Sequence, residues 1–333
     1  MPLVLSSPFC LPCTALDFVM WHVDTERVKS RSTTSVARSH PSLDHIRRQW
    51  MQSLNVVLAL LLLPLSASFN LPFTPTPTHK YTQAISDIDD TLKSSGGVSI
   101  GSINLGGIDT QYSRGSIYPG VFEFLYQITS HDATMPMNVA LLTARAEEFK
   151  ESLEIKENSK IMVKAREVGR KHGVGKWGVG PVLYGSVQEW VNQDNKGRRK
   201  FANFEMLREK NLELLPGLDI QYVFVGDTGE KDEECGEAML RYYCEDVVAV
   251  FMHFVGGRGE RVPSTRLING RPVIYYRTIV GAAVKALKFG LLEREAVMSV
   301  VEAARGDLKE AGEAVGSEKF DDVERDVGEF EAI

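Results

Sequence analysis

An apolar run that ends in closely spaced acids constrains the fold of this chain more than any other feature. The residues Gln-Ala-Ile-Ser lead directly into Asp87, and Asp89, Asp90 and Thr91 follow it. Side chains alternate along a strand, but the backbone can turn just past the strand end, so Asp87 and Asp89 can reach one pocket. One carboxylate could then attack a phosphoryl group while the other transfers protons. Such an attack needs the phosphoryl oxygens neutralised, and a hard ion that prefers oxygen ligands, Mg²⁺, suits that task.

Acidic triplets are also common in turns and in calcium loops, so these alternatives need weighing. An EF-hand loop that begins at Asp87 would require glycine at its sixth position and glutamate at its twelfth. The chain has Leu92 and Val98 at those positions. The residues therefore exclude an EF-hand loop at Asp87.

Three further segments place polar residues where they could join this pocket. The run Leu-Leu-Thr143-Ala-Arg ends an apolar stretch in a hydroxyl, which can hydrogen-bond a phosphoryl oxygen. Lys200 lies at the front of an expected helix, where an ammonium can offset developing negative charge. A β-type run ends in Gly-Asp227, and Asp232 follows five residues later. These carboxylates could complete a magnesium site.

In this order the four segments resemble the motifs of the haloacid dehalogenase superfamily, specifically its phosphatase branch. The match covers about residues 85–234, and the run 247–251 looks like a further strand of the same sheet. The resemblance implies an α/β fold with a Rossmann-like, mostly parallel sheet flanked by helices and with a small or minimal cap.

The resemblance also implies the chemical roles of the acids. Asp87 would be the nucleophile that forms an aspartyl-phosphate. Asp89 would protonate the leaving group and then activate water. Mg²⁺ would be held by Asp87, the backbone carbonyl of Asp89, and Asp227. Dividing one difficult displacement into two easier ones is the physical reason for a covalent route.

The remaining motif residues would bind the phosphoryl group or support the site. By the same resemblance, Thr143 and Lys200 would contact the phosphoryl oxygens. Asp232 would support the metal or the lysine, and Thr91 would support the first motif. An intact set of these residues argues against a pseudoenzyme, which would be expected to lack Asp89 or Lys200.

A narrower resemblance is to the catalytic domain of actin-patch phosphatidate phosphatases. It rests on Ser-Asp87-Ile-Asp-Asp-Thr, on Gly-Asp227-Thr-Gly-Glu-Lys-Asp, and on Pro119-Gly-Val before an expected helix. The chain departs from this family at Thr143-Ala-Arg, where the family tends to carry Ser-x-Ser-Pro. The resemblance implies phosphatidate or another lipid phosphate as substrate. A soluble sugar or nucleotide phosphate, and a non-catalytic phosphate-binding scaffold, stay as alternatives.

The segment between the first motif and Pro119 is rich in glycine and serine. This is where the superfamily places its first cap insertion, and so short an insertion, residues 93–117, suggests an open site. Tyr112 and Arg114 lie in it and could contact substrate. An ordinary surface connector is the competing interpretation.

The composition is that of a globular enzyme domain. Of 333 residues, 43% are hydrophobic and 25% are charged, which suffices for a sizeable core. The net charge of -6 argues against nucleic acid as a partner. Cys10 and Cys13 form a lone C-x-x-C, and Cys235 and Cys244 flank an expected helix, so we favour free thiols over a disulfide.

The N-terminal region, residues 1–68, differs from the rest of the chain. Its segment 54–68 is apolar, short for a bilayer span, and ends in Ser-Ala-Ser, which is typical of a signal peptide. Translation could start at Met1 or at Met51. Residues 69–82 read as a linker or transit segment and resemble the presequences of plastids bounded by extra membranes. Secretion and an uncleaved anchor are the alternatives, and all three place the protein outside the cytosol.

The sequence predicts a phosphatase domain over residues 83–300 and an acidic helix or frayed tail over residues 301–333. Apolar residues between 280 and 291 recur with helical spacing. Such a stripe usually packs on a core, whereas peripheral contact with a membrane would suit a lipid substrate.

Overall fold

The computed structural model shows an α/β architecture. It describes residues 80–100, 103–106, 108–131, 133, 135–146, 155–185, 196–229, 231–257 and 259–333, all within one compact unit, Pro77–Ile333. The signal-peptide-like segment and both candidate start residues lie outside the described residues. The last residues of the expected linker are described, and they belong to the first strand, which begins at Lys80.

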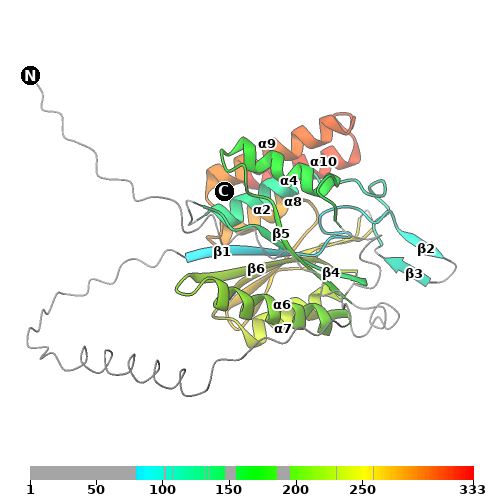
Figure 1. Cartoon of the computed structure of the whole chain (residues 1–333). Coiled ribbons are helices and arrows are strands. Elements are labelled where there is room, and N and C mark those ends of the chain that lie inside the picture. Colours follow the sequence, from blue (N-terminus) through cyan, green and yellow to red (C-terminus); the bar gives the residue numbers. More distant parts are fainter. Residues whose placement is uncertain are drawn as a thin grey trace, which may run out of the picture. The chain divides into compact units, whose positions relative to one another are not determined.

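Seven strands form one sheet through the middle of the molecule (Figure 1). Its order is β5 (Val179–Gly185), β4 (Val139–Ala146), β1 (Lys80–Ser86), β6 (Asp219–Asp227), β7 (Val247–His253), β9 (Arg271–Tyr276) and β8 (Arg266–Ile268). Every neighbouring pair is parallel except β8 and β9, which are antiparallel. The predicted α/β class with a mostly parallel sheet is therefore confirmed.

Helices cover both faces of the sheet, as its apolar strands require. Figure 1 shows one layer with α2 (Val121–Ser130), α4 (Lys160–Lys171), α8 (Ile279–Lys288), α9 (Arg294–Glu310) and α10 (Glu318–Glu331), and an opposite layer with α6 (Lys196–Leu214) and α7 (Asp232–Tyr242). Strand β7 illustrates the two cores. Ala249 and Phe251 pack in the first layer's core, whereas Val250 and Met252 pack in the second.

The expected short insertion after the first motif contains a hairpin of β2 (Val98–Ile100) and β3 (Ile103–Gly106). In Figure 1 it extends beyond the end of the sheet at which β4 terminates. Gly96 begins the approach to the hairpin with a φ of 72°, and a Cβ there would lie 2.6 Å from the Cβ of Arg114. Glycine is therefore required where the two limbs of the insertion meet.

The C-terminal region packs on the core more extensively than the sequence suggested. Helix α9 runs through residue 300, where we placed a domain boundary, and α10 follows it. Phe320, Val323, Val327 and Phe330 of α10 are buried because their spacing places them on one helical face. Acidic composition concealed this apolar stripe. Of the two alternatives for residues 301–333, a helix and a frayed tail, the structure shows helix, which comprises the end of α9 and all of α10.

The apolar stripe of residues 280–291 belongs largely to α8. Val280, Ala283 and Val284 are fully buried, and α8 packs against both α9 and α10. The core-packing interpretation of the stripe is therefore confirmed. Among the helices that the structure describes, none is both long and apolar enough to cross a membrane.

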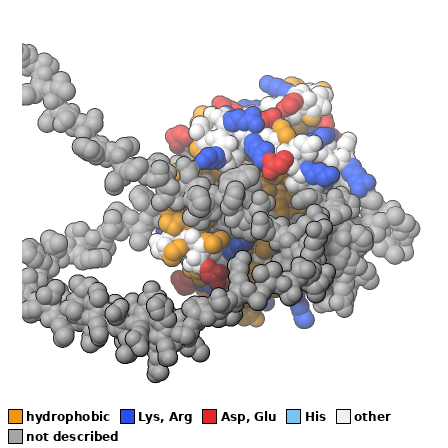
Figure 2. Space-filling view, in the orientation of Figure 1, with side chains coloured by type: hydrophobic (Ala, Val, Ile, Leu, Met, Phe, Trp, Pro, Cys, Tyr) orange, Lys and Arg blue, Asp and Glu red, His pale blue; other side chains and the backbone are white. Residues whose placement is uncertain are grey.

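Charged side chains are interspersed over the helical layer. Figure 2 shows Lys and Arg side chains close to Asp and Glu on the face that carries α4, α9 and α10. Lys164 of α4, for example, pairs with Asp307 at 2.9 Å and with Glu310 at 3.0 Å on α9. Such partly exposed pairs contribute little to stability, about 0–1 kcal/mol each.

Candidate functional site

Two acids from neighbouring parallel strands meet at one edge of the sheet. Asp87 directly follows β1, and Asp227 is the last residue of β6. The ladder pairs Ser86 with Val225, and the Asp87 amide donates to the Val225 carbonyl at 3.0 Å. Because parallel strands present the same end to the same edge, both carboxylates reach that edge together. Asp87 is 2% exposed and Asp227 is fully buried.

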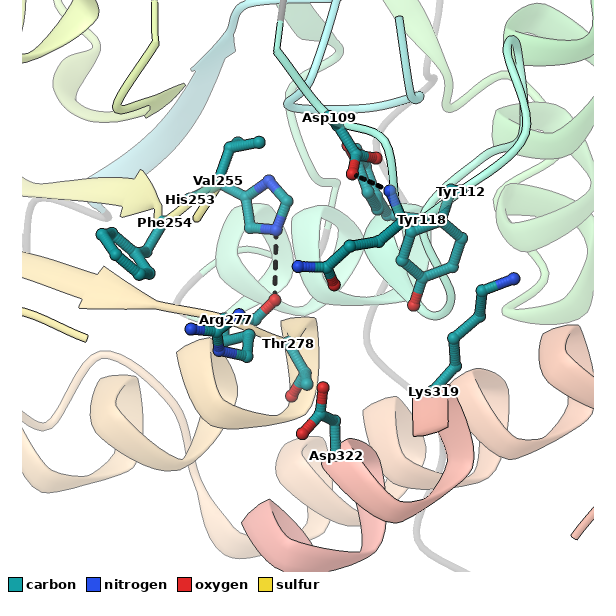
Figure 3. A pocket seen from close by; sticks show the side chains of 11 residues that line it. Asp109, Tyr112, Tyr118, His253, Phe254, Val255, Arg277, Thr278, Lys319 and Asp322 are labelled. Carbon is teal, nitrogen blue, oxygen red and sulfur yellow. Dashed lines mark hydrogen bonds between the residues drawn. The ribbon is translucent and has the colours of Figure 1, made fainter. Parts of the chain in front are cut away.

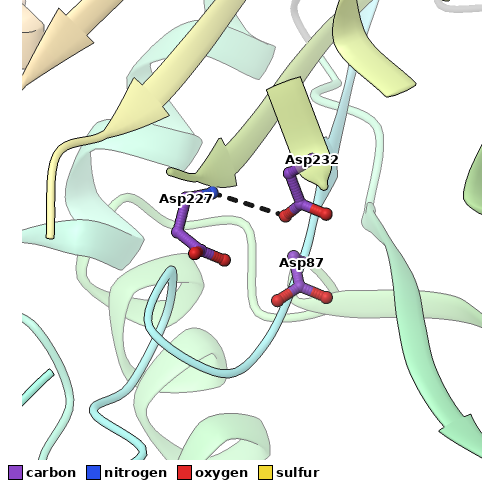
Figure 4. A group of neighbouring side chains, drawn as sticks. All are labelled: Asp87, Asp227 and Asp232. Atoms are coloured by element: carbon purple, nitrogen blue, oxygen red, sulfur yellow. Dashed lines mark hydrogen bonds between the residues drawn. The ribbon is translucent and has the colours of Figure 1, made fainter. Parts of the chain in front are cut away.

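A third acid, Asp232, joins them from the first residue of α7. Its Oδ2 accepts a hydrogen bond from the Asp227 amide at 3.3 Å. A Cβ on Gly226 would lie 2.6 Å from that oxygen, so glycine at this position permits the close approach. Carboxylate oxygens of Asp87, Asp227 and Asp232 all lie within 4.8 Å of one another (Figure 4).

Lys200 places an ammonium among these carboxylates. It lies on the inward face of α6 with Asn203, Phe204 and Leu207, at the i, i+3, i+4, i+7 spacing of a buried stripe, and is 1% exposed. Its Nζ lies 2.9 Å from Asp87 Oδ1 and also pairs with Asp232. A lysine so deeply buried needs partners, and the carboxylates provide them.

The two threonines of the predicted site are also buried. Thr143 lies in β4, which pairs with β1 so that Leu141 is opposite Ser86, and it is 3% exposed. Thr91 is fully buried, and its hydroxyl has no hydrogen-bond partner among the described residues. Thr143 thus lies in the strand beside β1, and Thr91 lies in the loop that follows Asp87.

Asp89 is arranged differently from the three clustered acids. It is half-buried, and its carboxylate pairs with Lys93 at 3.1 Å. It is not part of the carboxylate cluster within 4.8 Å.

Tyr112 and Arg114, the expected substrate contacts, lie elsewhere. Tyr112 lines a pocket beside the ends of β7 and β9, together with Tyr118, His253 and Lys319 (Figure 3). The Lys319 ammonium lies 4.7 Å from the Tyr112 ring, and burial, then the nearby Asp109 carboxylate, raises the pKa of Tyr112. Arg114 is exposed. The structure does not bring either of them into the aspartate cluster.

Sequence reasoning missed Asp90 and His253. Asp90 is fully buried with a φ of 59°, and its carbonyl lies 2.7 Å from His253 Nδ1. Burial lowers the pKa of His253, so its neutral form is favoured. The sequence offered one signal for Asp90, since it is a third acid next to Asp87 and Asp89, to which catalytic roles had been given.

The charges of the cluster suit a hard cation. Three buried carboxylates surround one ammonium, which leaves an excess of negative charge at low dielectric. Clustered carboxylate oxygens without sulfur or imidazole among them are the donors that Mg²⁺ and Ca²⁺ prefer. The residues therefore fit a divalent cation with oxygen ligands.

The two cysteines in the described part of the chain are free thiols. Cys235 is buried in α7, and Cys244 follows that helix and is half-buried. The prediction of free thiols is thus confirmed for this pair.

Comparisons with known proteins extend to sequence families, curated proteins and solved structures. No family model, curated protein or solved structure matches this chain. Function is therefore inferred from the residues of the site.

Proposed function

We propose that the protein is a Mg²⁺-dependent phosphomonoester hydrolase of the haloacid dehalogenase type. One observation carries the proposal: Asp87, Asp227 and Asp232 converge within 4.8 Å, buried, with the Lys200 ammonium 2.9 Å from Asp87. Separate segments supply these groups in the order that the phosphatase motifs require. Buried ionisable groups that converge in this way are found preferentially at functional sites.

The first half-reaction uses Asp87 and Asp89. A carboxylate oxygen of Asp87 attacks the phosphorus of the monoester, and the bond from phosphorus to the leaving oxygen breaks. Asp89, in its acid form, gives its proton to that oxygen and so releases an alcohol. Lys200, beside the attacked phosphoryl group, offsets the charge that develops on its oxygens, and the buried Thr143 hydroxyl can donate to one of them.

The second half-reaction restores the protein. Asp89 is now a carboxylate and takes a proton from water, whose oxygen attacks the same phosphorus. The bond between phosphorus and the Asp87 oxygen breaks, which releases inorganic phosphate and the Asp87 carboxylate. The half-buried position of Asp89 leaves its carboxylate partly accessible to water, as this step requires.

Asp87 and Asp227 would hold the Mg²⁺ ion, together with the Asp89 carbonyl. When bound, the ion neutralises phosphoryl oxygens and so makes phosphorus open to attack by an anion. Asp232 also pairs with the Lys200 ammonium and would orient it toward Asp87. Thr91, fully buried just after these acids, would support their loop by packing.

For the substrate we propose phosphatidate or another lipid phosphate, because the first and fourth motifs resemble those of actin-patch phosphatidate phosphatases. The segment 54–68 supports a location in the secretory pathway or in a plastid with extra bounding membranes.

Phosphate release by the purified protein tests the proposal. The substrates are dioctanoyl phosphatidate in mixed micelles, glucose 6-phosphate and a nucleoside monophosphate, each with Mg²⁺ or with EDTA. Asp87→Asn is expected to lower kcat at least about 10³-fold, as loss of a nucleophile does. Asp246→Asn, a substitution in a partly exposed ion pair with Arg208, is the matched control and should retain activity. Release that persists in Asp87→Asn would contradict the mechanism, and release from the soluble substrates alone would contradict the lipid assignment.

A further inference from the structure

Tyr276 carries a buried hydroxyl that has no hydrogen-bond partner in the described part of the chain. The residue ends β9 and is fully buried, and its ring packs with the rings of Phe251 and His253. A buried hydroxyl without a partner costs free energy, because it has given up its hydrogen bonds to water. In a native fold such a group is expected to bind an ordered water or an ion.

A second tyrosine beside His253 differs in this respect. Tyr118 packs edge-on against the imidazole with ring centroids 4.6 Å apart, and its hydroxyl donates to Asp109 Oδ2 at 2.7 Å. Tyr276 stacks on the same imidazole at 5.4 Å, but none of the described residues accepts from its hydroxyl. Phenylalanine would therefore serve the packing of Tyr276 equally well, and the hydroxyl needs another explanation.

The strand register places Tyr276 in one row with Asp227 of the carboxylate cluster. Asp227 of β6 is opposite His253 of β7, and His253 is opposite Tyr276 of β9. Val225 and Ile274, two positions before the ends of this row, both pack in the core of the first layer. Because side chains alternate along a strand, Asp227 and Tyr276 lie on that same face of the sheet.

The charge of Asp227 reaches the Tyr276 hydroxyl. Burial, then the Asp227 carboxylate, raises the pKa of Tyr276, so the phenol keeps its proton and can donate a hydrogen bond. No direct hydrogen bond joins the two side chains, in keeping with the strand β7 that lies between them. Neighbouring strands are about 4.8 Å apart, so a bridging molecule is needed to connect the two groups.

We propose that Tyr276 is a positioning residue whose hydroxyl donates, through an ordered water, to the Asp227 carboxylate and so holds this carboxylate in the orientation that binds the divalent cation. Carboxylates that ligate a metal are themselves hydrogen-bonded, and loss of such an outer partner lowers the metal affinity about 10–100-fold. A buried water suits this role because it makes about three hydrogen bonds. The proposal rests on the cation site of the proposed function, and it does not require hydrolysis of any ester.

Isothermal titration calorimetry of the full chain with Mg²⁺ tests the proposal at pH 7. Tyr276→Phe removes only the hydroxyl and should raise the Kd for Mg²⁺ about tenfold or more. Tyr222→Phe is the matched control, because Tyr222 is also buried in the sheet but packs in the second core, where its hydroxyl accepts from Asn211 at 3.1 Å. This control should bind Mg²⁺ as the native protein does. An unchanged Kd in Tyr276→Phe would overturn the proposal.

Thermal unfolding in EDTA separates this role from a structural one. A hydroxyl kept for the fold would lower the Tm when it is removed. We expect Tyr276→Phe to melt at or above the native Tm, because no protein partner loses a hydrogen bond. Tyr222→Phe should melt below it, since Asn211 loses an acceptor. A fall in the Tm of Tyr276→Phe together with an unchanged Kd would assign the hydroxyl to the fold and refute the proposed role.

The outcomes also distinguish this proposal from the phosphatase. A native protein that binds Mg²⁺ but releases phosphate from no substrate would contradict the phosphatase, while the Kd of Tyr276→Phe would still decide the role of Tyr276. A native protein that binds no Mg²⁺ would contradict both. A crystal structure with Mg²⁺ should show an ordered water within hydrogen-bond distance of the Tyr276 hydroxyl and the Asp227 carboxylate, and a dry hydroxyl there would rule the bridge out.

Discussion

Replacing Lys200 by methionine should destabilise the protein far more than the loss of an ordinary ion pair. The ammonium is 1% exposed, lies 2.9 Å from Asp87 Oδ1 and also pairs with Asp232. Methionine fills a similar volume but leaves two buried carboxylates without this cation. Removal of one partner from a buried pair costs about 3–5 kcal/mol, which is a large part of the stability of a typical domain.

Urea unfolding followed by circular dichroism measures this loss, in EDTA and at pH 7. Lys164→Met is the matched control, because Lys164 pairs with Asp307 and Glu310 at similar distances but its side chain is 26% exposed. That control should lose only about 0–1 kcal/mol. The double variant Lys200→Met/Asp232→Asn should be more stable than Lys200→Met alone, because one uncompensated charge is gone. A loss below about 1 kcal/mol for Lys200→Met would refute the reasoning, since the cluster would then not depend on its buried cation.

Three further predictions concern groups near the site. Burial lowers the pKa of His253 below 6.5. The neutral ring therefore stabilises the fold above pH 6.5, and this stability is lost as the pH falls through the lowered pKa. His253→Gln should flatten the pH dependence of the melting temperature in this window. Gly96→Ala should lower the free energy of unfolding in urea by about 1–3 kcal/mol, because φ is positive there and the new Cβ would clash with Arg114. Gly115 has a similar φ, but a Cβ there would meet no atom within 4 Å, so Gly115→Ala should show only the smaller backbone cost. Burial, then the charge of Asp232, raises the pKa of the Cys235 thiol. Iodoacetamide should therefore label Cys235 at pH 8 only after unfolding in urea, which peptide mapping by mass spectrometry would show. Rapid labelling in the folded protein would contradict the burial of this thiol.

Much of the sheet could be predicted because its strands are local patterns. Each apolar run that ends in a polar residue, before Asp87, Asp227 and around Thr143, became a parallel strand of the central sheet. Parallel strands bring their ends to one edge, so the sequence order of the polar residues was enough to expect their meeting. Lys200 could be predicted as well, because it lies at the front of a helix that follows β1 and β4 in the sequence.

The rest depends on contacts that no local pattern records. The bonds from Ile108 and Asp109 to Asp90 span 18 and 19 residues, and the insertion alone did not reveal them. Asp89 pairs with Lys93 and lies outside the carboxylate cluster, and its role as the acid and base stays a prediction. Tyr112 lies in a pocket with Tyr118 and Lys319, outside the aspartate cluster, and its contact with substrate stays a prediction.

The composition of the cluster argues that it is kept for chemistry. Buried carboxylates and a buried lysine lose hydration, and apolar residues of similar volume would often be equal or better for stability. Gly226 adds to this cost, because it gives up a side chain inside a strand so that Asp232 can approach. A chain selected for stability alone would not combine a weakened strand with three converging acids at one sheet edge. Departures from local rules of this kind concentrate at functional sites, which is why the aspartate cluster, and not the larger apolar core, is the place to test function first.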